Sequence, residues 1–365
     1  MLIKLKPIDT LFFRDSRSFS KGDETWANGI FPPAPSVFYG AIRSVYFSHH
    51  IDKLEKANEP DDPTKNLIIK NIYFRIGECD FFPLPQDLVA LKEEAKNNIN
   101  KYAYPLIMQD ISQYAHSGKT QVILTSNPDL KDTVESVKDG LIEKGNLQDY
   151  LFMGISSVEK FSYRKISEFV ESEPKIGIER SNCSRSSEEG MLYRVGMNRL
   201  IDFSFVIEFD GLDLPEKGFM KIGGEGKVVF YEKIDNTISL KNPNFSNSKE
   251  DNEFKIYIST PAIFKHGWLP GWLDLNSLEG TIPGINCKIK LITASLTKPI
   301  SIGGYDIKTN KPKPMRKAVG AGSVYYFWKL EGSMNEIVNV IHSKSISDQE
   351  SDKKQGFGIS YIGRV

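Results

Sequence analysis

Runs in which apolar and polar residues alternate recur from one end of the chain to the other. A period of two is typical of β-strands that bury one face. It is clearest at residues 2–6 and 201–209, and further apolar-rich runs predict strands at 67–76, 227–231, 254–259, 287–293, 324–328 and 359–362. Residues 37–46 follow the helical period instead, after the proline-rich residues 31–35. A helix is therefore expected to start at Pro35 or Ser36 and to end at His49 and His50.

The middle of the chain has a less regular pattern. Helical patches are predicted at residues 88–96 and 141–152, with a short strand at 121–125, and we interpret about 86–170 as an insertion. Two strand-like runs, 175–180 and 190–195, flank the polar, serine-rich residues 181–189. This arrangement predicts a β-hairpin finger over about 175–198.

A weak internal repeat organises the sequence. Each half begins with a strand and ends with a glycine-rich turn that leads into another strand: Gly223-Gly224-Glu225-Gly226 and Gly356-Phe357-Gly358. Strands mixed with helices, without strict alternation, predict an α+β fold, and two ferredoxin-like βαββαβ units would account for the pattern. The polar segment 234–253 reads as a linker, so we expect an N-terminal domain at 1–240 and a C-terminal domain at 250–365.

The net charge of the chain limits the kinds of nucleic-acid-binding protein that it could be. The 365 residues carry 47 Lys and Arg against 47 Asp and Glu, so the formal net charge is zero. This balance argues against a freely acting, strongly basic nucleic-acid binder, but it leaves local basic strips possible. One strip has no acid: Lys308, Lys311, Lys313, Arg316 and Lys317. It is either a solvated loop or a patch that follows a phosphate backbone.

A second basic cluster surrounds the predicted hairpin. It contains Arg180, Arg185, Arg194 and Arg199. Glu179, Glu188 and Glu189 partly neutralise it, so its charge signal is softer than that of the first strip.

The cysteines and the apolar runs bear on location. Cys79, Cys183 and Cys287 are single and far apart, which excludes a disulfide framework and a cysteine-based zinc site and fits a reducing cytoplasm. No apolar run approaches the roughly 20 residues of a membrane-spanning helix. The N-terminal residues do not resemble a signal peptide, because lysines, a proline and an aspartate interrupt their apolar run. We therefore expect a cytoplasmic protein without a membrane partner.

Motifs for catalysis and cofactor binding are absent from the sequence. Neither glycine-rich turn fits G-x-G-x-x-G or a P-loop, and each precedes a strand, so each is either a structural turn or a place where another backbone comes close. The five histidines have no partner at a recognisable spacing, and HExxH and GxSxG do not occur. Asp61 and Asp62, in a proline-flanked loop, are expected to face solvent. No cofactor and no metal are predicted.

Several long strings, in order, resemble one protein family. In residues 7–44 the pattern D-x-L-x-F-R-D-x-R-x-F falls on Asp9, Leu11, Phe13, Arg14, Asp15, Arg17 and Phe19. The pattern P-P-x-P-S-x-x-Y-G-A-x-R falls on Pro32, Pro33, Pro35, Ser36, Tyr39, Gly40, Ala41 and Arg43. Further matches lie at 176–195, 223–229, 315–327 and 356–363. The chain resembles the third-subunit family of the type III-B CRISPR Cmr effector module, in the RAMP superfamily.

The resemblance implies a non-catalytic RNA-binding subunit that takes part in antiviral defence. Such a subunit has two ferredoxin-like domains and holds the repeat-derived 5′ tag of the guide RNA. It also contacts the large polymerase/cyclase-like signature subunit and the first backbone RAMP subunit. The candidate RNA contacts are Arg14, Arg43, Arg180, Arg194, Gly223, Gly224, Gly226, Lys227, Arg316, Lys317, Gly356 and Gly358. For Arg14 and Arg43 the competing interpretation is an ion pair within the chain, with Asp9, Asp15 or Glu24.

A second hypothesis makes the protein an enzyme. RAMP endoribonucleases that mature guide RNA without metal usually place a histidine near the first helix, where it acts as general acid or base. His49 or His50 would then be the catalytic residue.

Overall fold

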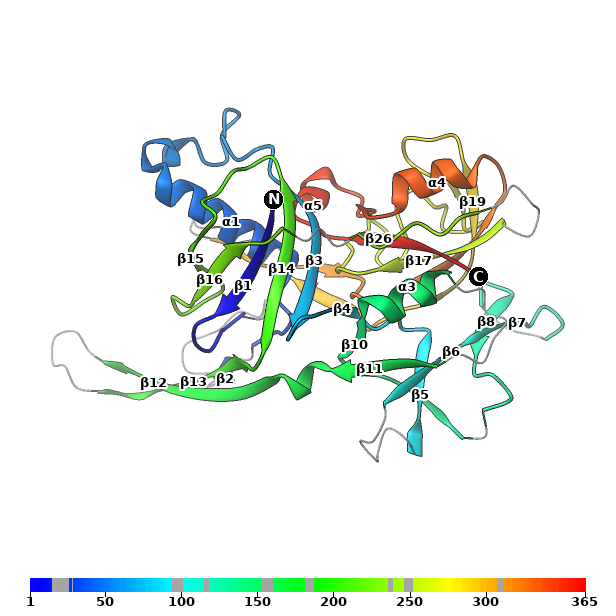
Figure 1. Cartoon of the computed structure of the whole chain (residues 1–365), viewed down its shortest axis with the longest axis horizontal. Coiled ribbons are helices and arrows are strands. Elements are labelled where there is room, and N and C mark those ends of the chain that lie inside the picture. Colours follow the sequence, from blue (N-terminus) through cyan, green and yellow to red (C-terminus); the bar gives the residue numbers. More distant parts are fainter. Residues whose placement is uncertain are drawn as a thin grey trace.

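Two antiparallel sheets form the framework of the protein (Figure 1). The computed structural model describes residues 1–14, 26–27, 29–93, 101–114, 118–130, 132–152, 160–180, 187–235, 239–245, 252–306 and 311–365. The larger sheet has eleven strands and belongs to the first part of the chain, and the smaller has six and belongs to the last. The predicted α+β class is confirmed.

The centre of the larger sheet has the strand order of a ferredoxin-like unit. The order is β16 (Val228–Lys233), β1 (Leu2–Pro7), β14 (Phe203–Asp210) and β3 (Ile68–Ile76), with antiparallel neighbours throughout. Helix α1 (Pro35–His49) makes the crossover from β1 to β3, as the apolar spacing predicted. A short edge strand, β15 (Lys217–Lys221), stands before β16 at the position of the unit's second helix.

The six-stranded sheet repeats this order. Its central strands are β26 (Ile359–Arg364), β17 (Glu253–Ile258), β24 (Val324–Lys329) and β19 (Lys288–Ser295), with β25 (Lys344–Ser345) and β18 (Glu279–Thr281) at the edges. Here the second helix is present, as α4 (Met334–Ile341), whereas β18 and turns replace the first one. The glycine-rich turn of each half therefore leads into the strand that pairs with that half's first strand.

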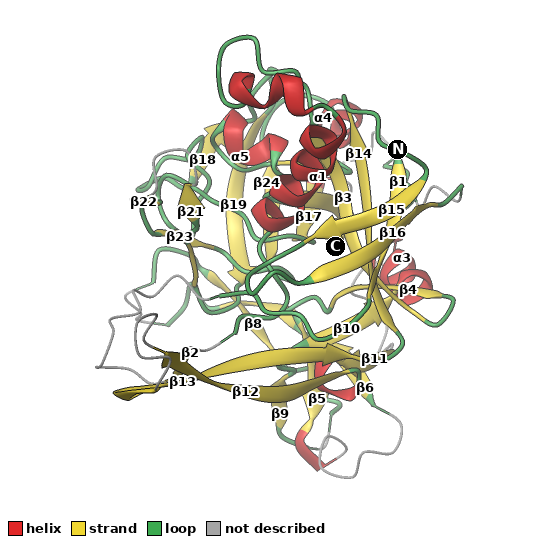
Figure 2. Cartoon of the chain, turned by 90° about the vertical axis from the view of Figure 1, so that its left-hand side faces the viewer, coloured by secondary structure: helices red, strands yellow, loops and turns green. Residues whose placement is uncertain are grey.

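The predicted hairpin finger is confirmed and is longer than expected. Strands β12 (Val170–Arg180) and β13 (Ser187–Leu200) pair from Val170 opposite Leu200 outward, and β2 (Trp26–Ala27) adds a short parallel strand. Residues 181–186 of the predicted polar tip lie outside the described residues. Figure 2 shows the finger on the side of the molecule opposite to α1, α4 and α5 (Glu350–Lys354).

The predicted insertion continues the first sheet. Beyond β3 the sheet adds β4 (Cys79–Pro83), β10 (Gly140–Glu143), β11 (Phe161–Lys165), β6 (Tyr102–Pro105), β5 (Leu88–Leu91) and β9 (Val134–Ser136). The helix predicted from residue 88 is wrong at its start, because Leu88–Leu91 pairs with β6 and β9 and is buried. The helix predicted at 141–152 begins later, as α3 (Lys144–Phe152), after strand β10.

The remaining elements are short. Three two-stranded ribbons pair β7 (Ile107–Asp110) with β8 (Val122–Thr125), β20 (Ile300–Ile302) with β23 (Arg316–Ala318), and β21 (Tyr305–Asp306) with β22 (Lys311–Pro312). Strand β8 was predicted. A short helix, α5 (Glu350–Lys354), precedes the closing glycine-rich turn, and 3₁₀ turns occur at η1 (Ile51–Lys56) and η2 (Ile166–Glu168). Among the described residues, no helix is both long and apolar enough to span a membrane.

A buried polar cluster joins the two halves. Asp87 follows β4 and accepts hydrogen bonds from Tyr150 of α3 and Tyr326 of β24. The ammonium group of Lys255, on β17, lies 3.5 Å from the centre of the Tyr150 ring. Asp87 is 1% exposed and Lys255 is 2% exposed. Because polar groups at this depth need partners, the cluster fixes how the halves pack against each other.

Candidate nucleic-acid interface

Three predicted elements converge around Phe12: the first loop, the first glycine-rich turn and the hairpin. Leu11 and Asn198 of β13 exchange backbone hydrogen bonds of 2.8 and 2.7 Å. The carbonyl of Phe12 accepts a 2.8 Å bond from the Gly224 amide, and its ring packs against Val195 and Met197. The family pattern had pointed to the first loop, the turn and the hairpin one by one. It did not predict that Phe12 joins them, although Phe12 stands between the apolar Leu11 and Phe13 in a loop rich in charge.

The glycines of this turn differ in what they contact. Gly223 has φ +71°, and a Cβ there would lie 2.3 Å from the Phe12 carbonyl oxygen. A Cβ on Gly224 would lie 3.0 Å from the Phe12 ring. Gly226 also has a positive φ, +64°, but faces open space. The backbone that approaches Gly223 and Gly224 is thus the protein's own, which leaves Gly226 as the open position of the turn.

Lys227 and Arg199 are already paired at this convergence. The Lys227 ammonium bonds Asp9 and Thr10, each at 3.0 Å, and its side chain is only 11% exposed. Arg199 bonds Glu173 and also reaches Asp9. The Thr10 backbone amide and then Lys227 lower the pKa of the Asp9 carboxyl to about 2. Lys227 therefore stabilises the first loop.

Arg14 and Arg194 lie exposed on neighbouring segments of the same region. Arg14 forms a bridge with Gly29, and Arg194 of β13 stands in register with Trp26 of β2. The structure thus brings these two predicted contacts together. Arg180 ends β12, and its side chain lies outside the described residues.

Arg43 is held inside the protein. Its guanidinium bonds Asp62 and Thr64, each at 2.7 Å. The expected partners Asp9, Asp15 and Glu24 were therefore wrong for Arg43, and so was the expectation that Asp62 faces solvent, because it is 6% exposed. Burial alone would raise the pKa of Asp62, but bonds from Thr64 and Asn58 and the charge of Arg43 lower it. Only Asp61 is exposed, where it pairs with Lys56.

The basic strip and the closing turn meet at α5. Arg316 makes two hydrogen bonds to Asp352, of 2.8 and 2.7 Å, while the exposed Lys317 bonds Ser301. A Cβ on Gly356 would lie 2.8 Å from Ile69, and one on Gly358 would lie 2.6 Å from the Ser347 hydroxyl. These glycines pack inside the protein. Lys311 and Lys313 are exposed, and Lys308 lies outside the described residues.

The histidines of the enzyme hypothesis stand where predicted. His49 is the last residue of α1 and His50 caps it, with its ring 4.5 Å from that of Tyr46. Among the described residues, no group of three or more His, Cys, Asp or Glu side chains could hold a metal ion.

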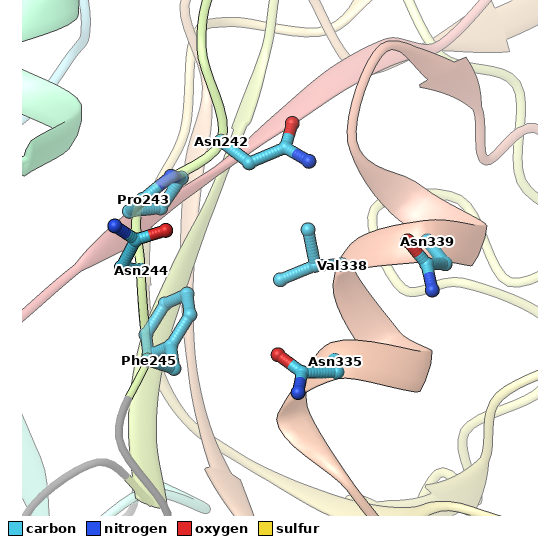
Figure 3. A pocket seen from close by; sticks show the side chains of 7 residues that line it. All are labelled: Asn242, Pro243, Asn244, Phe245, Asn335, Val338 and Asn339. Carbon is cyan, nitrogen blue, oxygen red and sulfur yellow. The ribbon is translucent and has the colours of Figure 1, made fainter.

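The structure contains a pocket of about 500 Å³ that the sequence did not predict. Residues 242–245, which line one side of it, lie in the segment that was interpreted as a linker. The pocket lies between residues 242–245 and helix α4 (Figure 3). Its lining residues are uncharged: Asn242, Pro243, Asn244, Phe245, Asn335, Val338 and Asn339. Asparagine amides can bond the edge of a nucleobase or a peptide group, so the chemistry of the pocket does not select one class of ligand.

Comparisons with known proteins agree with this fold. A search of curated proteins found no match. Among the solved structures that match, two have a TM-score of 0.53 and 16% identity, and each match covers 93% of this chain and 88% of the other. They are cryo-EM structures of the type III-B Cmr-beta bound to cognate target RNA, one of them also with AMPPnP in state 1. At this identity they support the fold alone.

The family assignment comes from the sequence. The profile of the family described as CRISPR-associated protein (Cas_Cmr3) matches residues 3–365. This match covers the strings on which the resemblance rested, including the first loop, the hairpin and both glycine-rich turns. The chain belongs to the Cas_Cmr3 family of CRISPR-associated proteins.

Proposed function

We propose that this protein is a non-catalytic RNA-binding subunit of a type III-B CRISPR RNA-guided effector complex, active in antiviral defence. It holds the 5′ repeat-derived tag of the guide RNA. It bridges the large polymerase/cyclase-like signature subunit to the first backbone RAMP subunit, with residues 1–240 and 250–365 as its two domains. The family match over residues 3–365 carries the proposal. The complex acts in the cytoplasm, where widely spaced cysteines stay reduced.

The convergence around Phe12 supports a location for the tag. Exposed Arg14 and Arg194 lie on two of the converging segments, Gly226 is the open position of the turn that contacts Phe12, and Arg180 stands further along the same finger. Phosphate contacts from arginine fix the register of an RNA strand, while exposed backbone lets it come close. We assign direct contacts to these residues and to Lys317, which is exposed on β23.

The other predicted residues act by supporting the site. Lys227, Arg43 and Arg316 each neutralise a carboxylate of the chain. Gly223, Gly224, Gly356 and Gly358 make room for neighbouring protein atoms. Their substitution is expected to disturb RNA binding through the shape of the loops.

Binding of tagged and untagged guide RNA by the reconstituted complex tests the proposal. Arg194→Ala should weaken binding of the tagged RNA. It should also reduce the slope of log K against log salt concentration by about 0.7, the value of one phosphate contact on a single strand. Untagged RNA should bind both proteins equally. Lys290→Ala, on β19, is the control, because Lys290 is half-exposed and belongs to the six-stranded sheet rather than to the finger. Equal losses for both RNAs would contradict a tag site.

The non-catalytic part of the proposal has its own test. Purified protein is incubated with repeat-containing RNA in the absence of metal, alongside the His49→Ala/His50→Ala double variant. We expect no site-specific product from either protein. Cleavage that disappears in the double variant would support the endoribonuclease instead.

A further inference from the structure

The face of the first sheet opposite to α1 carries an aromatic pair at its edge. Phe219 of β15 stands directly across from Phe230 of β16, and Phe230 stands across from Lys6 of β1. Directly opposed residues project from the same face of a sheet. The two rings are 5.8 Å apart, and Phe219 is 68% exposed.

Neighbouring positions on this face are mostly lysines. Lys217 opposes Glu232, which in turn opposes Lys4, and Lys221 opposes Val228. The alternate residues point the other way: Leu5 lies across from Phe205, whose ring contacts Phe38 of α1. Helix α1 thus covers one face. The aromatic-lysine face, formed by Phe219, Phe230, Lys4, Lys6, Lys217 and Lys221, is the edge of the other, which is already buried at Val206 across from Lys4. Figures 1 and 2 show β15, β16 and β1 side by side.

The lysines of the aromatic-lysine face differ from the cations of the predicted site. Within the part of the chain that the structure describes, the side chains of Lys4, Lys6, Lys217 and Lys221 form no hydrogen bond or ion pair, whereas those of Lys227, Arg43 and Arg316 are each paired with a carboxylate. Glu232 is the one acid in the rows around the rings. The excess of positive charge is therefore available to a polyanion.

We propose that the aromatic-lysine face binds single-stranded nucleic acid independently of the guide tag. Phe219 and Phe230 stack unpaired bases, and the four lysines bind the phosphates around them. Exposed rings with surrounding cations are the features of sequence-tolerant single-strand binding. A protein partner fits less well, because lysine is depleted in the cores of protein interfaces.

The test uses the full chain and a labelled single-stranded RNA of about 12 nucleotides that lacks any tag, at low salt. Phe219→Ala should weaken binding roughly tenfold, the effect of losing one stacked base. The double variant Lys217→Gln/Lys221→Gln should reduce the slope of log K against log salt concentration by about 1.4, the value of two phosphate contacts on a single strand. Ile51→Ala and Lys138→Gln are matched controls, because both side chains are highly exposed on other elements.

Three outcomes would overturn the proposal. They are no binding of the RNA by the unaltered chain, equal affinities for Phe219→Ala and Ile51→Ala, or an equal loss with duplex RNA. A Phe219→Ala variant that binds RNA normally but fails to assemble would identify the face as a protein interface. Single-stranded DNA of the same sequence distinguishes general stacking from recognition of RNA. Because the probe has no tag, Arg194→Ala should leave its binding unchanged, so failure here is distinguishable from failure of the tag site.

Discussion

The guanidinium of Arg316 makes two hydrogen bonds to the carboxylate of Asp352, which is completely buried. Asp352 belongs to α5, and its carbonyl accepts the amide of Phe357 in the closing glycine-rich turn. The pair therefore ties the basic strip to that turn. A residue predicted from its charge to contact RNA is instead the ionic partner of a buried acid.

Arg316→Ala should lower the free energy of unfolding by about 3 kcal/mol, because it leaves a buried carboxylate without its partner. Lys317→Ala should cost less than about 1 kcal/mol, since Lys317 is exposed and bonds only the Ser301 hydroxyl. Urea unfolding of both variants measures the difference. Similar small losses would show that the Arg316 pair adds little, and a loss of tagged-RNA binding confined to Lys317→Ala would assign the RNA contact to that residue.

The first glycine-rich turn offers a matched pair of substitutions. Gly223 and Gly226 have nearly the same positive φ, so alanine is strained at both by roughly 1 kcal/mol. Only at Gly223 does the new Cβ meet the Phe12 carbonyl. Gly223→Ala should therefore be less stable than Gly226→Ala by about another 1 kcal/mol, the value of the Gly224–Phe12 hydrogen bond. Equal melting temperatures would contradict this close approach.

Lys255 should make the free energy of unfolding depend on pH in the alkaline range. Burial lowers the pKa of its ammonium group to about 8, although the charge of Asp87 opposes the shift. The unfolded chain, with an ordinary lysine pKa, binds more protons between pH 8 and about 10.5, so the lysine's contribution to stability rises with pH across that window.

The measurement compares the parent with Lys255→Met, which removes the titrating group. The stability of the parent relative to the variant should increase by about 1.4 kcal/mol per pH unit above pH 8. Unfolding is measured from pH 7.5 to 9.5, and because the parent and the variant contain the same tyrosines and cysteines, ionisation of these groups in the unfolded chains largely cancels in the difference. A constant difference would show that Lys255 keeps its ordinary pKa.

Gly40 lies exposed in the interior of α1, where a Cβ would meet no atom within 4 Å. Gly40→Ala should stabilise the isolated protein by about 1 kcal/mol, because alanine has the higher helix propensity. Thermal unfolding measures the gain in stability, and reconstitution with the other subunits measures whether the variant still assembles. Normal assembly of the stabilised variant would show that no partner subunit requires a glycine at this position.

Local patterns in the sequence were sufficient to predict most of the framework. The four central strands of each sheet, helix α1, the hairpin and the two glycine-rich turns were predicted, because alternation, helical spacing and turn residues act over a few neighbours. The same reasoning failed at residues 88–91, which look helical beside their charged neighbours. Pairing with β6 and β9 decides that segment.

The partners of charged and glycine residues were decided by tertiary structure alone. Lys227 bonds Asp9 across 218 residues of sequence, and Arg43 bonds an aspartate that looked exposed. Gly223 and Gly356 make room for Phe12 and Ile69, and the aromatic-lysine face exists only because three strands lie in one register. Residue type establishes that a group is charged or small, but the fold determines which atoms it meets, because those atoms come from distant parts of the chain.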